Sequence, residues 1–450
     1  MEIIQSIFGF FIAIGILVTF HEFGHFYIAR LFNVKVLNFS IGFGKTLYKK
    51  KFHNEGTEYS VGLIPLGGYV KMLESSELDP DLDKDKHPYC FDKQSVYKRF
   101  LIVAAGPVFN LILAIIFFTI VHFSGITGMK PFVTSIDGHN LPQIEGKSFH
   151  EIVEVNGVMT QRWQDVRVEI LNIIVNKNKL NLLVKDYKNE TSSLQINYDK
   201  NILQRDGDIV VNLGLHPRKP EFPSTIGTIE NNSPASLSGL KIGDRVFSVN
   251  NQAIDSWNGL VEKIQNNANN ILKLKIDRSG EILDIILVPA TNKNSSNQSG
   301  YAGISPDQTE LNNFRILVKY PFFESFYKST LLTYDYSILT FKMIFELFTG
   351  QANMKNISGP LSIAEFSGKS LSMGFVYFAY LLAILSISLG VLNLLPIPLL
   401  DGGHLVYYML EMLTGNPVSE KFQLVAQQVG MLILFSIMIV AFYNDFARLL

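Results

Sequence analysis

Four long apolar runs constrain the fold of this sequence more than any other feature. Each run is close to the roughly 20 residues that a helix needs to cross about 30 Å of hydrocarbon. The 450-residue chain is 47% hydrophobic and only 18% charged, which is more apolar than a soluble protein of this length needs. We therefore expect an α-helical polytopic membrane protein whose four transmembrane helices lie in the ranges 1–31, 100–123, 375–400 and 425–446.

Basic residues predict the orientation of these spans. The range 32–99, between the first two spans, is rich in lysine and arginine, including Lys49–Lys51, Lys98 and Arg99. Loops with such a bias stay on the cytoplasmic side of a membrane. We expect both termini and the range 124–373 on the opposite side.

The range 32–99 also contains a small membrane-associated β element. Alternating apolar residues with glycines between them indicate short strands, and the charged range 74–93 is typical of a loop. The four expected strands are Val36–Ile41, Thr46–Phe52, Glu58–Leu63 and Gly68–Met72.

An internal repeat indicates two tandem β-rich domains, in the ranges 124–218 and 219–308. In each copy an Asn-containing turn is followed by a tryptophan, a helical stretch, two strands and a short glycine loop. The second copy contains SPASLSGLKIGDRVFSVN, which resembles the signature of PDZ domains, whereas the first lacks most of it. PDZ domains bind an extended peptide as an added strand, so Gly303 and Ile304 are candidate peptide-binding residues. Alternatively, the domains only fill space or gate access.

Two ranges flank the third span. The range 309–374 is aromatic-rich, and its charges recur too often for a lipid-exposed span. We expect amphipathic helices at the outer interface there, with a fifth span within 320–350 as the alternative. The range 401–424 is expected to be a cytoplasmic-side loop.

The motif His21-Glu22-Phe23-Gly24-His25 interrupts the first apolar run. Histidines four residues apart share one helix face and can hold one zinc ion, while Glu22 can take a proton from the water that the metal activates. Ionisable groups within a span are costly and usually functional. A divalent cation satisfies two histidines and a glutamate together, so we expect a catalytic zinc site.

A catalytic zinc ion of this type needs a third protein ligand. The preferred candidate is Asp401, at the end of the third apolar run, with His404 as the alternative. Pro396 and Pro398 cannot donate backbone hydrogen bonds, so the helix must break before Asp401. Irregular backbone at membrane depth is tolerated where it lines an enclosed cavity. Gly402–Gly403 are expected to let the chain turn so that the carboxylate faces the metal.

These paired motifs closely resemble those of the site-2 protease family of intramembrane metalloproteases, in its bacterial regulator-of-sigma-E protease branch. The resemblance covers nearly the whole chain and rests on FHEFGHFYIAR, SIGFGKTLYKK, PLGGYVKM, AAGPVFN, SGPLSIA and NLLPIPLLDGGHL. It implies that Zn²⁺ is bound by His21, His25 and Asp401, with Glu22 as the general base. It also implies cleavage of transmembrane segments after another protease has removed the outer domain of the substrate.

The same resemblance implies partners and a location. The substrates would be single-pass membrane proteins, such as an anti-sigma factor, and signal-peptide remnants. The protein would lie in the bacterial inner membrane, with the PDZ domains in the periplasm and the active site toward the cytoplasm. The range 36–72 would present an unwound substrate to the metal. The substrate strand would be held by Asn393, Pro396 and Pro398.

The resemblance also places Gly106, Pro107 and Asn110 of the second span near the site, although helix packing explains them equally well. A second class of function is a membrane-anchored PDZ adaptor without proteolytic turnover, against which Glu22 argues because a structural metal needs no base. A net charge of −1 offers no basic face for nucleic acid. The lone Cys90 excludes an internal disulfide framework and is interpreted as an unreactive thiol.

Overall fold

The computed structural model describes residues 2–51, 56–79, 84–139, 141, 149–291 and 299–449. Within these ranges, four helices are long and apolar enough to cross a membrane, as the sequence predicted. They are α1 (Glu2–Leu31), α2 (Val96–Ser124), α10 (Phe375–Leu394) and α12 (Glu420–Leu449). The third is shorter than predicted: it ends at Leu394 and not at 400, because Pro396 and Pro398 cannot continue a helix.

Helix α2 is the centre of the membrane bundle. It contacts α1, α10, α8 (Phe322–Phe348) and α11 (Asp401–Thr414). Its contact with α1 is close, because a β-carbon on Gly24 would lie only 2.5 Å from the carbonyl oxygen of Ala105. A glycine inside the HExxH motif therefore brings the histidine-bearing face of α1 directly onto α2.

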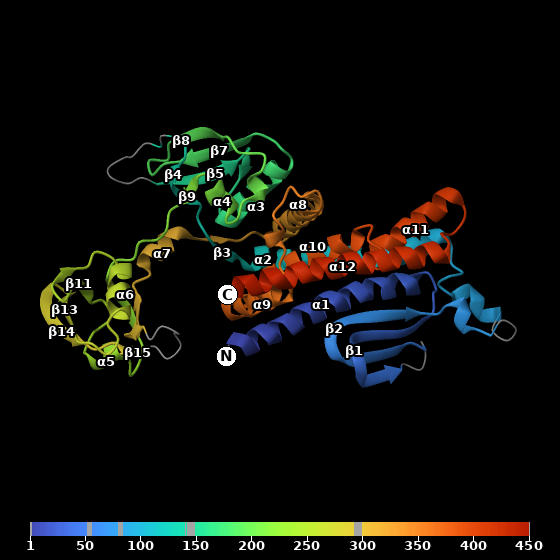
Figure 1. Ribbon diagram of the computed structural model, residues 1–450, viewed down its shortest axis with the longest axis horizontal. Coiled ribbons are helices and arrows are strands. Elements are labelled where there is room, and N and C mark those ends of the chain that lie inside the picture. The colour runs from blue at the N-terminus through green and yellow to red at the C-terminus, as the bar shows by residue number, and fades with distance from the viewer. Residues whose placement is uncertain are drawn as a thin grey trace.

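The β element between α1 and α2 consists of β1 (Val36–Lys51) and β2 (Glu58–Met72). Both strands bend, so that Phe39 pairs with Val70 on one side and with Tyr59 on the other. The result is a sheet of four strand segments, as the sequence predicted, with 68–72 and 46–51 at its edges. Phe26 of α1 packs against the rings of Phe39 and Tyr59. This contact fixes the sheet beside the C-terminal half of α1 (Figure 1).

Short 3₁₀ turns follow the sheet. They are η1 (Ser75–Glu77) and η2 (Lys84–Tyr89), so the range 74–93 is not a featureless loop. Positions 80–83 of that range, and Phe52 of the second predicted strand, lie outside the described residues.

The first β-rich unit contains a six-stranded sheet in the order β8-β7-β5-β4-β9, with β6 paired to β5. Helix α3 covers it, and Val166 and Ile170 of that helix are fully buried in the core. The elements are β4 (Phe132–Ile136), β5 (His150–Val155), β6 (Val158–Met159), α3 (Trp163–Val175), β7 (Leu180–Lys185), β8 (Thr191–Ile196), η3 (Ile202–Gln204), α4 (Ile209–Asn212) and β9 (Leu215–Pro217).

The second β-rich unit repeats this connectivity. In both units a hairpin is followed by a helix and two further antiparallel strands, and the last strand returns to pair with the first. The internal repeat in the sequence is therefore a repeat of element order, although the first unit has one six-stranded sheet and the second has a four-stranded sheet and two two-stranded sheets. The elements are β10 (Ile226–Ile229), α5 (Pro234–Leu237), β11 (Arg245–Val249), β12 (Gln252–Ala253), α6 (Trp257–Gln265), β13 (Leu272–Arg278), β14 (Glu281–Leu287), β15 (Ala290–Thr291), β16 (Gly300–Tyr301) and β17 (Ile304–Pro306).

A buried ion pair holds the second unit together. Arg278 donates to both carboxylate oxygens of Asp244, which is 1% exposed, and the backbone N–H of Lys241 donates to the same group. Burial alone would raise the pKa of Asp244, but these hydrogen bonds hold that pKa below its usual range. The aspartate of the GLKIGD segment thus has a structural role.

The β-rich units join the membrane bundle through a strand pair that the sequence did not predict. Strand β3 (Ile126–Met129), directly after α2, pairs with β18 (Arg315–Val318), directly before α8. Figure 1 shows the first unit beside α8 and both units toward the end of the bundle where the termini lie.

The range 309–374 contains helices, as expected: α7 (Thr309–Phe314), α8, η4 (Met354–Asn356) and α9 (Pro360–Met373). None of these is among the four candidate spans found in the described part of the chain, so the alternative of a fifth span within 320–350 finds no support there. The range 401–424 is corrected: its first fourteen residues form the helix α11, not a loop.

Candidate metal centre

The two histidines of the HExxH motif lie on the face of α1 that packs against α2. His21 and His25 are only 8% and 9% exposed, and their rings are in edge contact. Nδ1 of His25 lies 2.9 Å from the carbonyl oxygen of Ile102 in α2 and donates to it. This hydrogen bond leaves Nε2 of His25 without a proton, as a metal ligand requires.

Asp401 reaches the same place from the break between α10 and α11. It is the first residue of α11, and the connection before it contains Leu399 with a φ of 90°. A side chain other than glycine in this conformation costs about 1–3 kcal/mol, and it persists only where the surrounding structure holds it. The strained backbone of Leu399 therefore lies two residues before Asp401, whose carboxylate is the candidate ligand.

The structure corrects the expected reason for Gly402 and Gly403. Both residues lie inside α11 and neither has a positive φ, so they do not provide a turn. A β-carbon on Gly402 would lie 2.0 Å from the carbonyl oxygen of Leu395, and one on Gly403 would lie 2.7 Å from that of Ile397. The two glycines allow the first turn of α11 to pack directly on the broken segment.

Three potential ligand atoms converge at this point. Oδ2 of Asp401 lies 3.1 Å from Nε2 of His21 and 3.5 Å from Nε2 of His25. The two Nε2 atoms lie 3.3 Å apart. Within the described residues, this is the one group of three such side chains with ligand atoms within 4.8 Å of one another.

The arrangement fits zinc. Three ligands of a tetrahedral zinc ion, with bonds of about 2.0–2.1 Å, lie about 3.3 Å from one another. Oδ2 of Asp401 is also a buried oxygen with no hydrogen-bond partner among the described residues. Three protein ligands leave a fourth position open, which is typical of catalytic rather than structural zinc.

Glu22 of α1 lies beside this group, on the side of the helix that faces the β1–β2 sheet. Its carboxylate lies near the imidazoles of His21 and His25 and is hydrogen-bonded by the backbone of Val70 in β2. A β-carbon on Gly68 would lie 3.3 Å from Cγ of Glu22. The edge segment 68–72 of the sheet therefore runs alongside the glutamate of the motif.

One stripe of α2 frames the two imidazole rings. Ile102, Gly106 and Asn110 are four residues apart and so share a helix face. Ile102 accepts from His25, Nδ2 of Asn110 lies 3.0 Å from Nδ1 of His21, and a β-carbon on Gly106 would lie 2.3 Å from Nε2 of His25. The structure thus brings Gly106 and Asn110 to the site, where the sequence left helix packing as an equal explanation.

The remaining candidate residues lie in three different places. Asn393 lies in the last turn of α10, and Pro396 and Pro398 lie in the break before Asp401. His404, the alternative ligand, is not part of the three-residue group, and its ring contacts Tyr407. The other two candidates, Gly303 and Ile304, lie in the second β-rich unit.

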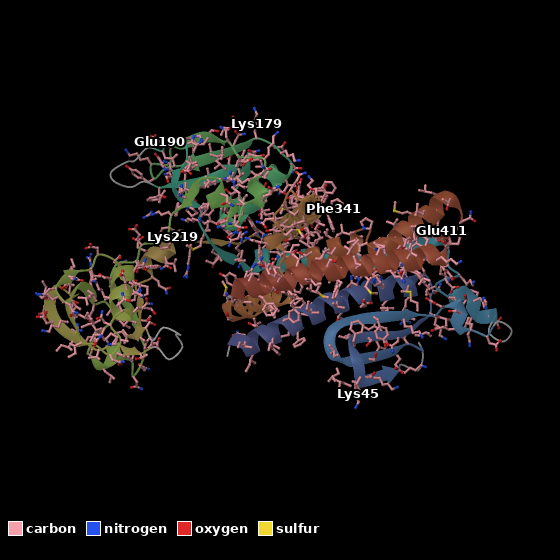
Figure 2. All side chains as sticks on the ribbon, in the orientation of Figure 1. Lys45, Lys179, Glu190, Lys219, Phe341 and Glu411 are labelled. Atoms are coloured by element: carbon pink, nitrogen blue, oxygen red, sulfur yellow. The ribbon has the colours of Figure 1, made fainter. Side chains whose placement is uncertain are left out.

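A contact that sequence reasoning missed attaches α11 to α2. Nη2 of Arg99 lies 2.7 Å from Oε1 of Glu411, and both side chains are less than one-fifth exposed. The guanidinium also stacks on Tyr408. Glu411 lies at the end of the bundle away from the β-rich units (Figure 2). In the sequence, Arg99 and Glu411 are only two opposite charges near two different apolar runs, and this pattern does not predict that they pair.

Comparisons with known proteins agree with this geometry. The model of peptidase family M50 matches residues 9–437. A putative zinc metalloprotease of Vibrio cholerae is 37% identical over 455 residues, covering 100% of both chains. Protease RseP of Yersinia pestis is 36% identical over 462 residues, again covering 100% of both. Regulator of sigma-E protease RseP of Escherichia coli K12 is 35% identical over 444 residues, 98% of each chain.

The match therefore extends over both candidate metal motifs and over the four apolar helices. Relatives of this similarity that are covered over their whole length share the family and its chemistry. This chain belongs to peptidase family M50 and is an intramembrane zinc metalloprotease.

Proposed function

We propose that His21, His25 and Asp401 hold the zinc ion and that Glu22 is the general base of peptide hydrolysis. The observation that carries this proposal is the convergence of Nε2, Nε2 and Oδ2 at separations of 3.1–3.5 Å. When bound there, zinc supplies a Lewis acid that activates water and polarises the scissile carbonyl. His404 is not needed as a ligand because it lies outside this group.

Glu22 would move the proton in the proposed reaction. Its carboxylate is next to both histidines and points toward the edge segment of the sheet, where a substrate peptide would lie. It takes the proton of the attacking water and passes it to the departing amine. A metal site with a purely structural role would need no carboxylate at this position.

The substrate is a transmembrane segment of a single-pass membrane protein. A transmembrane helix protects its peptide bonds by internal hydrogen bonding, so it must unwind before hydrolysis. The segment 68–72 supports such a step, because it is an edge of the β1–β2 sheet and lies alongside Glu22. Pairing there would replace the hydrogen bonds lost on unwinding. On the other side, Asn393, Pro396 and Pro398 of the helix break would hold the same extended strand.

The orientation follows from charge. Lysines and arginines of the β1–β2 sheet and its neighbouring turns would lie in the cytoplasm, so both β-rich units would lie in the periplasm of a bacterial inner membrane. Lys45 is in the part of the sheet farthest from α1 (Figure 2). Relatives such as that of Escherichia coli K12 are named regulator of sigma-E protease. As substrates we propose anti-sigma factors whose outer domain has already been removed, together with signal-peptide remnants.

The two β-rich units are proposed to be PDZ-like domains. In the second unit, β17 pairs with β10 and with no other strand of the described residues, so one of its edges is free. Ile304 begins this strand, and Gly303, with a φ of 73°, directly precedes it. Addition of a substrate tail to that edge would place the tail next to these two residues.

The test is cleavage of a tagged single-pass reporter that lacks its outer domain, by the purified protein in detergent. Wild type, Glu22→Gln and the matched control Glu324→Gln, an exposed carboxylate of α8 outside the site, are compared. Zinc content is measured in each sample. We expect product from wild type and the control, none from Glu22→Gln, and zinc in all three.

Other outcomes are equally informative. Product from Glu22→Gln at the wild-type rate would refute the assignment of the base. Zinc in every sample without product from any of them, across several reporters, would favour a membrane-anchored adaptor. A reporter that retains its outer domain should be cleaved much more slowly, and equal rates would contradict the proposed order of cleavages.

A further inference from the structure

Asn110 of α2 is a buried polar residue whose side-chain amide is only partly hydrogen-bonded. It is 0% exposed, and its Nδ2 lies 3.0 Å from Nδ1 of His21. Its Oδ1 is buried and has no hydrogen-bond partner among the described residues. Its position along α10 is fixed, because Oγ of Ser386 donates to its backbone carbonyl at 2.7 Å.

The orientation of the His21 ring determines whether its Nδ1 needs a hydrogen-bond acceptor or a donor from Asn110. Nε2 of His21 faces Asp401 and His25, so this nitrogen is the one available to a metal. An imidazole that binds a metal through Nε2 carries its proton on Nδ1 and donates it to an acceptor. An amide N–H₂ group cannot accept this proton, whereas an amide oxygen can.

A half-turn of the Asn110 amide exchanges its oxygen and nitrogen without changing its shape. We propose that Asn110 is the positioning residue of His21: its Oδ1 accepts from Nδ1–H of His21 and so holds Nε2 unprotonated toward zinc. This inference rests on the proposed role of His21 as a ligand. It gives the buried amide oxygen the partner that it otherwise lacks.

The two histidines are then oriented by the same face of α2 through different groups. His25 uses the backbone carbonyl of Ile102, which no single substitution removes. His21 uses a side chain, so the metal site is sensitive to substitution at Asn110. Interactions of this kind with metal-bound histidine typically change metal affinity by about 10–100-fold.

The experiment measures zinc affinity of the full-length protein in detergent by competition with a chelator. Asn110→Leu has a similar size and no acceptor, and we expect it to bind zinc about 10–100-fold more weakly. Asn110→Asp keeps an acceptor in the same place and should restore affinity to within a few-fold of wild type. Thr119→Val removes a buried hydroxyl of α2 that donates to the carbonyl of Ile115 in the same helix, and it should leave zinc affinity unchanged.

His21→Ala separates this inference from the proposed ligand set. Wild-type zinc affinity in Asn110→Leu, with zinc lost in His21→Ala, would overturn the role of Asn110 and leave the ligands intact. Wild-type affinity in both variants would refute His21 as a ligand. Equal loss in Asn110→Leu and Asn110→Asp would also overturn the inference, because the acceptor would then have no effect. Should Asn110→Leu not fold, Asn110→Ala gives the same test, because it removes the acceptor without adding a branched side chain.

Discussion

Gly106→Ala is a single-methyl change whose effect on the metal centre can be calculated from the structure. The new β-carbon would lie 2.3 Å from Nε2 and 2.6 Å from Cε1 of His25, and 2.8 Å from Cε1 of His21. Ordinary contact begins near 3.4 Å, so the ring of His25 would have to move by about 1 Å. Metal–ligand distances tolerate deviations of only about 0.2 Å. The ring cannot retreat freely, because Nδ1 is held by the carbonyl of Ile102.

We therefore expect Gly106→Ala to weaken zinc binding by about 100-fold or more, beyond the usual effect of losing an outer hydrogen bond. Overpacking should also lower the free energy of unfolding by about 1–3 kcal/mol. Zinc affinity is measured by chelator competition, and proteolysis by reporter cleavage. The matched control is Gly15→Ala, the same substitution in α1, where a β-carbon meets nothing within 4 Å.

Wild-type zinc affinity and proteolysis in Gly106→Ala would refute the claim that both imidazole rings lie against this face of α2. Loss of zinc in Gly15→Ala as well would show that any added methyl in the membrane helices disturbs the site. The first result would refute the geometry on this face of α2, and the second would show that loss of zinc in Gly106→Ala is not specific to that face.

Three further predictions concern the surrounding structure. Arg99→Met leaves the partly buried Glu411 without its partner and should lower the free energy of unfolding by about 1–3 kcal/mol. Adding Glu411→Gln to the same chain should recover part of this loss, as measured by thermal unfolding. Gly303→Ala should destabilise the second β-rich unit by about 1–3 kcal/mol but leave zinc binding unchanged, because φ is 73° and the new β-carbon would lie 2.3 Å from Cβ of Ser233. Burial lowers the pKa of His150 below the ordinary value of about 6.5, so its contribution to stability is present above that pH and is lost as the pH falls. Denaturant unfolding above and below about pH 6.5 should show this loss in wild type and much less of it in His150→Gln.

The parts of the fold that could be predicted from the sequence depend on local patterns. Apolar runs located the four membrane helices to within a few residues, and prolines predicted the break before Asp401. The alternating pattern of 36–72 predicted the four strand segments, because side-chain alternation is a property of each strand by itself. The repeated motif likewise predicted two units, which share the same order of hairpin, helix and antiparallel strands.

The parts that could not be predicted depend on contacts between distant segments. The pairing of β3 with β18 joins segments almost two hundred residues apart, and neither strand is longer than four residues. The glycines after Asp401 signalled a turn, but their role is close packing inside α11, which requires knowledge of the neighbouring backbone. The contact of Asn110 with His21 also joins two helices, and only the structure distinguishes it from helix packing.

The central claim is that zinc is held by His21, His25 and Asp401, with one position open to water. Zinc K-edge X-ray absorption of the purified protein tests it most directly, because it counts imidazole ligands and distinguishes oxygen from sulfur. We predict two imidazoles and oxygen ligands in wild type, an unchanged spectrum in His404→Ala, and loss of the site in Asp401→Ala. A spectrum that changes in His404→Ala but not in Asp401→Ala would contradict the account.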